Sequence, residues 1–248
     1  MLAILPDSVN VGDGIFVLSN DEVNRLNLPN NEHTLLRPYY DTKNIRRYYF
    51  DTENKYQIIY TTSDFKNASM MDDYPILKKH LDFYAKVITS DNKPYGLHRA
   101  RQSEFFDNPS IASLRKCSAP TFAYLNKQAY LTAEWYLIKT KRLNMVYLTC
   151  LFNSSLVKFW LLKMGKMQGN IFQIDKEPLL NIPIVSPSSS GESEIIELHN
   201  KLTSMMLANN NSIIVDIEKR IDEIIYKEYE LSDNDIAVIK DELMAWGN

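Results

Sequence analysis

The last quarter of the chain has the apolar spacing of two amphipathic helices. Apolar residues recur every three or four positions on either side of residues 209–211, three asparagines that we expect to form the turn between the helices. Ser232, followed by Asp235 three residues later, resembles a capping box and predicts a short third helix toward Trp246. The tail is therefore expected to be a helical hairpin with an added helix. The residues that set the spacing are Ile195, Leu198, Leu202 and Met205, then Ile214, Ile217, Ile221, Ile224 and Ile225.

A run of small residues precedes this tail. Residues 186–191 read Ser-Pro-Ser-Ser-Ser-Gly, a composition typical of a linker. The charge balance changes at the same point, because residues 1–191 carry 23 Lys and Arg against 18 Asp and Glu, whereas residues 192–248 carry 5 against 13. We therefore predict a first domain over residues 1–185, a linker over 186–191 and a helical region over 192–248. The locally basic first domain is compatible with a confined binding surface.

The first domain mixes strand and helix patterns without a regular alternation. Ser19 with Glu22 three residues later marks a short helix that starts near Asn20. The fold class expected is α+β, a mixed strand and helix domain followed by the helical tail. The predicted strands are residues 14–18, 56–61, 121–125 and 135–138, and the longer predicted helices are residues 74–88 and 143–163.

Composition excludes several classes of protein. The chain has 248 residues, of which 45% are hydrophobic and 24% charged, an ordinary globular composition. No apolar run approaches the roughly 18 residues of a membrane span, and no secretion signal is recognised, so we expect no membrane and a cytoplasmic location. Two cysteines and four scattered histidines give no metal-binding spacing. The single Gly-x-Gly precedes a strand pattern and is no nucleotide fingerprint, so no cofactor is expected in this chain.

Basic residues interleaved with aromatic and amide side chains are the chemistry that stands out. This mixture suits contacts to the phosphates and base edges of nucleic acid. In residues 37–49, the richest stretch, Arg46 or Arg47 could instead pair with a carboxylate such as Asp51 while the tyrosines pack. The other clusters could equally be solvated loops. The candidates are Arg37, Arg46, Arg47, Tyr48, Arg99, Arg101, Lys116 and Lys166.

The last of these clusters combines charge with glycines. Lys163, Lys166, Gln168, Asn170 and Gln173 surround Gly165 and Gly169. Because glycine lets a backbone come close to a ligand, this stretch is able to approach a phosphate backbone. A simple surface loop is the alternative interpretation.

An ordered set of landmarks points to a known family. They are residues 12–18, 35–40, 45–48, 57–60, 74–81, 115–120, 122–124, 130, 136–138, 151–160 and 180–184, with 221–226 and 229–232 in the tail. In this order they resemble the target-recognition (specificity) domain of TaqI-like adenine-N6 DNA methyltransferases and fused type II restriction-modification enzymes. The methyltransferase and nuclease parts of those enzymes are missing, so the chain looks like a fragment or a separate specificity subunit.

The resemblance implies a module that reads double-stranded DNA while a partner methyltransferase rotates the target adenine out of the stack. It implies recognition without catalysis in this chain, and S-adenosylmethionine bound by the partner. The family motifs do not fix the residues that contact bases, so the candidates above rest on charge and on their placement in loops.

Two other functions stay open. Asp41 followed by Glu53 and Lys55 fits the carboxylate and lysine pattern of a metal-dependent nuclease, although a polar turn explains the same residues. Alternatively, the isoleucine and methionine stripes of the tail make it an assembly device for self-association or for another subunit.

Overall fold

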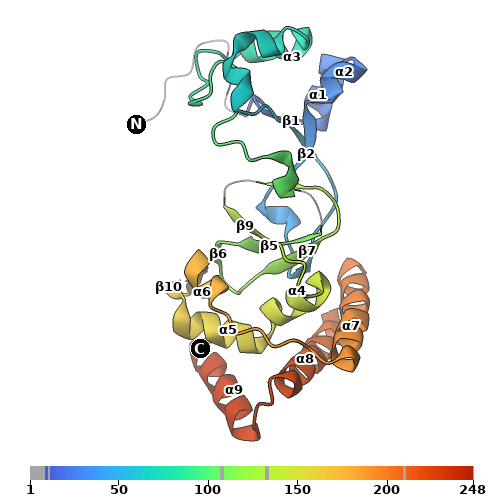
Figure 1. Cartoon of the computed structure of the whole chain (residues 1–248), viewed down its shortest axis with the longest axis vertical. Helices are drawn as coiled ribbons and strands as arrows, with labels where there is room; N and C mark the ends of the chain where they lie inside the picture. Colours follow the sequence, from blue (N-terminus) through green and yellow to red (C-terminus); the bar gives the residue numbers. More distant parts are fainter. Residues whose placement is uncertain (1–8, 11, 107–108, 132–133, 209–210, 248) are drawn as a thin grey trace. The chain divides into compact units, whose positions relative to one another are not determined.

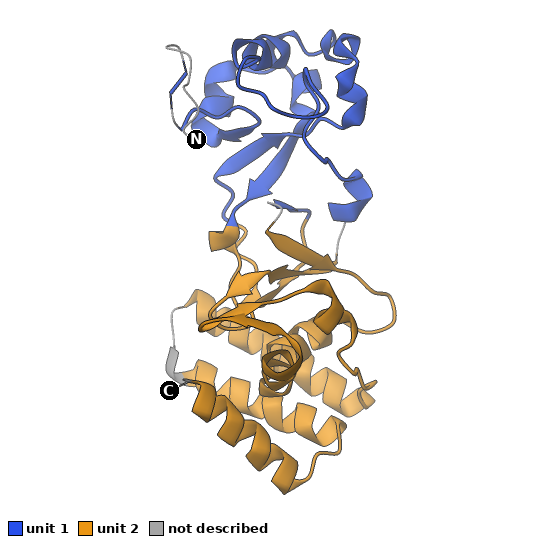
Figure 2. Cartoon of the chain, turned by 90° about the vertical axis from the view of Figure 1, so that its left-hand side faces the viewer, with its two compact units in different colours: residues 1–41, 53–107, 128–131 blue, residues 42–52, 108–127, 132–248 orange. Residues whose placement is uncertain are grey.

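The computed structural model describes residues 9–10, 12–106, 109–131, 134–208 and 211–247 (Figure 1). The chain forms two compact units (Figure 2). Unit 1 contains residues 1–41, 53–107 and 128–131, and unit 2 contains residues 42–52, 108–127 and 132–248. The helical tail expected to stand apart at residues 192–248 therefore belongs to the same unit as residues 108–127.

Unit 1 is built on a four-stranded sheet. The strand order is β1-β4-β2-β8, with β2 and β8 parallel and the other pairs antiparallel. The capping box at Ser19 and Glu22 is confirmed, because the Ser19 side chain accepts from the Glu22 amide and the Glu22 carboxylate accepts from the Ser19 amide. The elements, with η for a 3-10 helix, are β1 (Val17–Ser19), α1 (Asn20–Leu26), α2 (Asn30–His33), β2 (Leu36–Tyr40), β4 (Tyr56–Ile59), η2 (Ser63–Lys66), η3 (Ala68–Met71), α3 (Pro75–Phe83), η4 (Ser103–Phe106) and β8 (Tyr130–Leu131).

A buried carboxylate sets the start of α3. Glu32 in α2 is 0% exposed, and its two oxygens accept from the amides of Ile76 (3.0 Å) and Leu77 (2.7 Å). These amides are among those that the first turn of a helix leaves unpaired. Leu77 and Leu81 then point into the core of unit 1. The helix ends at Phe83, five residues earlier than the spacing predicts.

Unit 2 contains two sheets and six α-helices among its described residues. The larger sheet has the order β3-β7-β5-β9, and the smaller has the order β10-β11-β6. The elements are η1 (Thr42–Asn44), β3 (Tyr48–Tyr49), β5 (Ser110–Leu114), β6 (Lys116–Cys117), β7 (Phe122–Leu125), β9 (Trp135–Ile138), α4 (Met145–Asn153), α5 (Ser155–Met164), β10 (Lys166–Gln168), β11 (Ile171–Gln173), α6 (Lys176–Leu180), α7 (Ser189–Leu207), α8 (Asn211–Glu228) and α9 (Asp233–Gly247).

The helix expected over residues 143–163 is two helices. α4 and α5 meet at 62° around Ser154, whose side chain accepts from the Val157 amide at 3.3 Å. The Asp222 carboxylate of α8 accepts from the Ser155 amide at 2.9 Å and from its hydroxyl at 2.6 Å. Two caps therefore stabilise a new helix start. Within the described residues no single helix is long and apolar enough to span a membrane, and only the bent α4–α5 pair passes that test, by length and composition alone.

The tail helices complete the core of unit 2. Ile195, Ile221 and Ile225 are 0% exposed and belong to one cluster with Phe122 and Leu151. The predicted helices are confirmed, but α7 begins at Ser189 with Ser188 as its N-cap, so the second half of the expected linker is helical. Residues 209 and 210 of the expected asparagine turn lie outside the described residues. Because apolar burial dominates the folding free energy, the buried isoleucines of the tail stabilise its packing in the same core as Phe122 of the larger sheet.

His199 in α7 makes the stability of unit 2 sensitive to pH. Its side chain is buried, with Nε2 3.1 Å from the Tyr48 carbonyl oxygen, and this burial lowers its pKa. Unfolded histidine has a pKa of about 6.5, so as the pH falls below that value the unfolded chain takes up the proton first and the folded state loses stability.

We expect His199→Gln, which retains a donor for the Tyr48 carbonyl, to lose less unfolding free energy than the wild type when the pH is lowered from about 7.5 to 5.5. Urea unfolding at both pH values measures this difference. Asp222, whose pKa burial raises, acts in the opposite direction but is present in both proteins. Equal losses in the two proteins would contradict the assignment.

Candidate nucleic-acid interface

The small sheet of unit 2 brings two of the predicted cations onto one surface. Lys166 in β10 pairs with Gln173 in β11, and Gln173 pairs with Lys116 in β6. The three residues thus form a row across the sheet, although 50 positions of sequence separate the two lysines. Because successive side chains of a strand point to opposite faces, Gln168 and Ile171 share this face with the row. Lys116, Lys166, Gln168 and Ile171 are exposed.

The opposite face of the small sheet is packed. Met167, Phe172 and Cys117 alternate with the exposed residues and contact the core of unit 2. Phe172 is 1% exposed, and its ring centroid lies 4.8 Å from that of Trp246 in α9. Burial also raises the pKa of the Cys117 thiol to about 11. The sheet is therefore supported from behind and presents only its other face to solvent.

Hydrogen bonds connect the polar side chains of the exposed face. Lys116 Nζ donates to Gln168 Oε1 at 3.3 Å, Gln168 Nε2 donates to Gln173 Oε1 at 2.8 Å, and Gln173 Nε2 donates to Asp175 Oδ1 at 3.2 Å. Lys166 Nζ lies 3.3 Å from Asp175 Oδ2. The hydrogen bonds from Gln173 and Lys166 lower the pKa of Asp175, so this carboxylate stays ionised at neutral pH. The network holds two cations and two amides in a fixed order.

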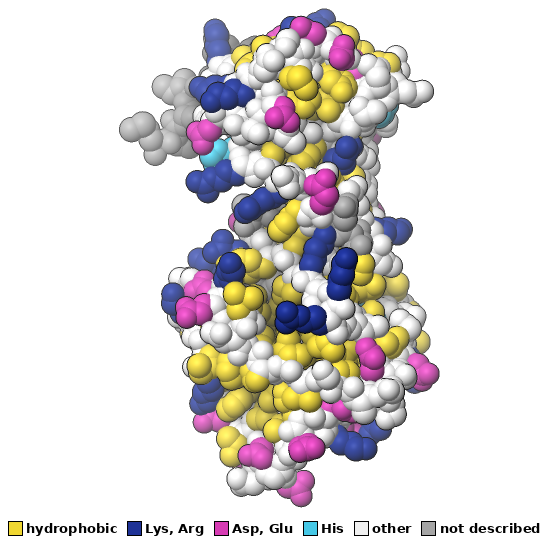
Figure 3. All heavy atoms as spheres, viewed as in Figure 1, with side chains coloured by type: hydrophobic (Ala, Val, Ile, Leu, Met, Phe, Trp, Pro, Cys, Tyr) yellow, Lys and Arg dark blue, Asp and Glu magenta, His cyan; other side chains and the backbone are white. Residues whose placement is uncertain are grey.

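Charged side chains gather around this sheet. Figure 3 shows Lys, Arg, Asp and Glu side chains where Figure 1 places β6 and β10, beside a broad hydrophobic area over α5. Arg115, next to Lys116, is exposed and lies 5.2 Å from the centroid of the Tyr136 ring. The backbone of Arg115 accepts from the Ile174 amide at 2.8 Å. Arg115 is therefore a further exposed cation beside the sheet, with its backbone held by Ile174, which follows β11.

The two glycines expected to admit a phosphate have different roles. Gly169 begins the two-residue turn of the β10–β11 hairpin with φ +61°, and an added Cβ would meet nothing within 4 Å. Gly165 ends α5, and an added Cβ there would collide with the Leu161 carbonyl oxygen. Only the Gly169 turn is therefore open for close approach, which corrects the expectation for Gly165.

The three candidates within residues 42–52, which are Arg46, Arg47 and Tyr48, have different surroundings. Tyr48 is 1% exposed in the core, which corrects the expectation that it lies on a DNA face. The Arg47 guanidinium donates to the Glu218 carboxylate of α8 and to the Asn153 carbonyl. The alternative that Arg47 pairs with a carboxylate is thus confirmed, with Glu218 as its partner. Arg46 is exposed, and its side chain makes no hydrogen bond or ion pair within the described part of the chain.

We expect Arg47→Ala to lower the unfolding free energy of unit 2 by about 1–2 kcal/mol, because it leaves the partly buried Glu218 and the Asn153 carbonyl without their donor. The neighbouring Arg46→Ala is the matched control, with an expected change of less than about 0.5 kcal/mol. Urea unfolding followed by circular dichroism compares them. An equal effect of both substitutions would contradict the structural role of Arg47.

The remaining candidates lie in unit 1. Arg37 in β2 donates from Nη1 to the carbonyls of Thr34 (2.6 Å) and Leu36 (2.8 Å), so it is turned onto its own backbone. Arg99 is exposed with φ +55°, and Arg101 is exposed 5.7 Å from the Phe105 ring centroid. Arg99 and Arg101 are thus exposed in one short segment, whereas Arg37 lies in β2.

The structure also places the residues on which the two alternative functions, a metal-dependent nuclease and an assembly device, depend. Lys55 Nζ lies 3.5 Å from Glu53 Oε1, and the described residues contain no group of three His, Cys, Asp or Glu side chains that could hold a metal ion. The isoleucine stripe of the tail is buried in unit 2. The stripe therefore contributes to the core of unit 2, and its buried side chains do not form an exposed surface for assembly.

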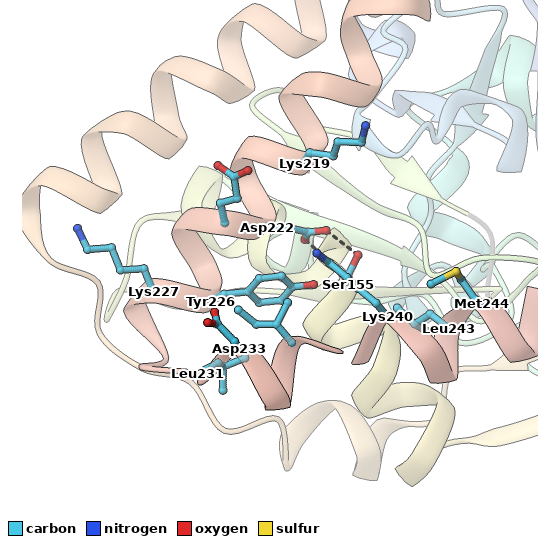
Figure 4. Close-up of a pocket in the computed structure, with 12 residues that line it drawn as sticks. Ser155, Lys219, Asp222, Tyr226, Lys227, Leu231, Asp233, Lys240, Leu243 and Met244 are labelled. Carbon is cyan, nitrogen blue, oxygen red and sulfur yellow. Dashed lines mark hydrogen bonds between the residues drawn. The ribbon is translucent and has the colours of Figure 1, made fainter. Parts of the chain in front are cut away.

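α8 and α9, together with Ser155 of α5, line an open pocket of about 730 Å³, and none of the eight candidates lines it (Figure 4). Ser155 and the Asp222 carboxylate meet in it, and Lys219 and Lys227 extend to opposite sides. Burial raises the pKa of Asp222, despite the hydrogen bonds from Ser155. We assign this carboxylate to capping α5.

The sequence analysis names Gln168 and Gln173 as members of the glycine-containing stretch but not as candidate contacts, and it does not name Asp175. The signal was present in the alternation of polar and apolar residues on both sides of Gly169 and Asn170, which is typical of a hairpin. The connection to Lys116 has no such local signal.

A solved structure has a similar fold. The fold is similar to part of the type IIL restriction-modification enzyme MmeI, solved in complex with DNA, with a TM-score of 0.67 at 12% identity. The match covers 94% of this chain and 34% of the MmeI chain, so the chain spans about a third of that enzyme's length. No curated protein sequence matches the chain.

The family follows from the sequence itself. The TaqI-like C-terminal specificity domain matches residues 37–184, and the chain belongs to this family. The resemblance seen in the ordered landmarks is thereby confirmed, as is the α+β fold class. Specificity domains of this family are generally non-catalytic.

Proposed function

We propose that this chain reads a double-stranded DNA sequence for the methyltransferase part of a restriction-modification system. The observation that carries the proposal is the exposed face of the β10-β11-β6 sheet, with Lys116 and Lys166 on either side of Gln173. Lysines neutralise phosphates, while amides hydrogen-bond to base edges. An antiparallel β-ribbon is one of the elements that fit the major groove. A surface with both functions on such a ribbon suits sequence-specific binding.

Family membership supports this proposal, and so does the fold shared with an enzyme solved on DNA. In the proposed complex this chain supplies recognition, and the methyltransferase domain or subunit binds S-adenosylmethionine and modifies the flipped adenine. Arg37, Arg46, Arg99 and Arg101 would add contacts to the phosphates. Exposed Arg46, Arg99 and Arg101 suit this role better than Arg37, whose guanidinium is bound to carbonyls.

Selection of bound duplexes from a randomised pool by the purified chain, at near-physiological salt and followed by sequencing, tests the proposal. We expect enrichment of a motif of a few base pairs. Single-stranded pools of the same sequences are the control and should not be enriched. Binding that enriches no motif and disappears as the salt concentration rises would contradict sequence reading by this chain.

A further inference from the structure

We infer that Gln168, at the tip of the β10–β11 hairpin, reads an adenine through the major groove. The inference rests on the proposed function and adds to it the identity of a base and of the residue that recognises it. It depends on three features of the exposed sheet face: the orientation of the Gln168 amide, its unused hydrogen-bonding atoms and its accessibility.

The charged ends of the network fix the amide orientation. An ammonium group only donates hydrogen bonds, so Lys116 Nζ, at 3.3 Å, requires Oε1 of Gln168 to face it. An ionised carboxylate only accepts, so Asp175 requires Nε2 of Gln173 to face it, at 3.2 Å. With both ends set, the 2.8 Å bond between the glutamines runs from Gln168 Nε2 to Gln173 Oε1. A flip of either amide would place two donors or two acceptors together.

The bonds in the network leave Gln168 with one donor and one acceptor. Its Nε2 carries two hydrogens and uses one for Gln173, while its Oε1 has two lone pairs and uses one for Lys116. In the major groove adenine presents the N7 acceptor next to the N6 amino donor, and a glutamine amide binds both at once. Guanine presents two acceptors there, so it does not match an amide that offers one donor and one acceptor.

The hairpin tip is open to a duplex. Gln168, Gly169, Asn170 and Ile171 are all exposed, and no heavy atom lies within 4 Å of a Cβ added at Gly169. Lys116 and Lys166 lie behind the tip on the same face, where they can reach the phosphates that border the groove. Gln173 lies half-buried between them and holds Gln168 by its hydrogen bond, so we assign it a positioning role.

The test uses the selection described above with the wild type, Gln168→Leu and Gln168→Glu. We expect the wild-type motif to contain an adenine whose replacement weakens binding at least fivefold, within the range of about 1–3 kcal/mol for a bidentate contact. Gln168→Leu should remove the preference at that position alone, and Gln168→Glu, which can only accept, should move it toward cytosine. Gln102→Leu, at an exposed glutamine of unit 1, is the matched control and should leave the motif unchanged.

A duplex with 7-deazaadenine at the same position tests the contact atom by atom. Because this base lacks N7, it should weaken wild-type binding at least threefold and leave binding by Gln168→Leu unchanged. An unaltered motif in Gln168→Leu would overturn the adenine assignment and leave the proposed function standing. Failure of the wild type to enrich any motif would overturn both.

Discussion

A chain that ends at Gly191 is expected not to fold its second unit. The truncation removes all but the first residues of α7, and all of α8 and α9. Ile195, Ile221 and Ile225 of these helices are 0% exposed in the core shared with Phe122. It also removes Asp222, which caps Ser155 at the start of α5. Burial of each of these isoleucine side chains contributes about 1.5–3 kcal/mol, so their combined loss is comparable to the roughly 5–15 kcal/mol by which a typical domain is stable. Circular dichroism and amide NMR spectra of the truncated chain measure the outcome.

Two milder changes separate loss of the core from loss of chain length. Ile221→Ala should lower the unfolding free energy of unit 2 by about 2–5 kcal/mol, as for other fully buried isoleucines. Val238→Ala in α9 removes a side chain that is 46% exposed and should change it by less than about 0.5 kcal/mol. A truncated chain that retains the dispersed NMR spectrum of unit 2 would show that the tail is an independent appendage and contradict this account.

Replacing Lys116 and Lys166 together by alanine is expected to give the second large effect. Each neutralised phosphate contributes about −0.9 to the slope of log K against log salt concentration, so the double variant should have a slope shallower by about 2. We expect its affinity for duplex DNA to fall on the order of tenfold at moderate salt, nearly uniformly across sequences that keep the adenine proposed for Gln168, whose amide Lys116 orients. Fluorescence anisotropy titrations at several salt concentrations measure both quantities.

The matched control replaces two exposed lysines of the tail helices, Lys201 in α7 and Lys227 in α8. This control removes the same net charge from helices that are not part of the small sheet. Its slope of log K against log salt concentration and its affinity for duplex DNA should therefore stay close to those of the wild type. An equal loss in both double variants would show a general charge effect and would remove the small sheet from the proposed interface.

The parts of the fold that depend on local sequence were predictable. The tail helices follow from apolar spacing and from caps a few residues away. The four predicted strands of the two larger sheets are found, residues 135–138 with the predicted ends and the other three with shifted ends. The break between α4 and α5 was not predictable, because the apolar pattern runs through it and Asp222, which caps Ser155, is 67 residues away. β2 was missed as a strand because Pro38 interrupts its pattern.

The candidate site shows the same division. Lys116 and Lys166 were selected singly for their charge, but only the pairing of β11 with both β10 and β6 places them in one row. Tyr48 is a candidate in the sequence because it lies among basic residues, and the sequence does not show which way its side chain points. In the structure this side chain is buried in the core. Arg46 and Arg47 are adjacent and equally basic, yet only Arg47 has Glu218 of α8 within reach. Tertiary contacts therefore decide which cations remain for DNA.

Site-specific photo-crosslinking tests the central claim most directly. A photo-reactive residue replaces Asn170 at the hairpin tip in one protein and Lys201 in α7 in another, both exposed positions. Each substituted protein is irradiated with the selected duplex and with a scrambled duplex. The account predicts a crosslink from position 170 to bases within the selected motif and little or none from position 201. Crosslinks from position 201 with none from position 170 would contradict it.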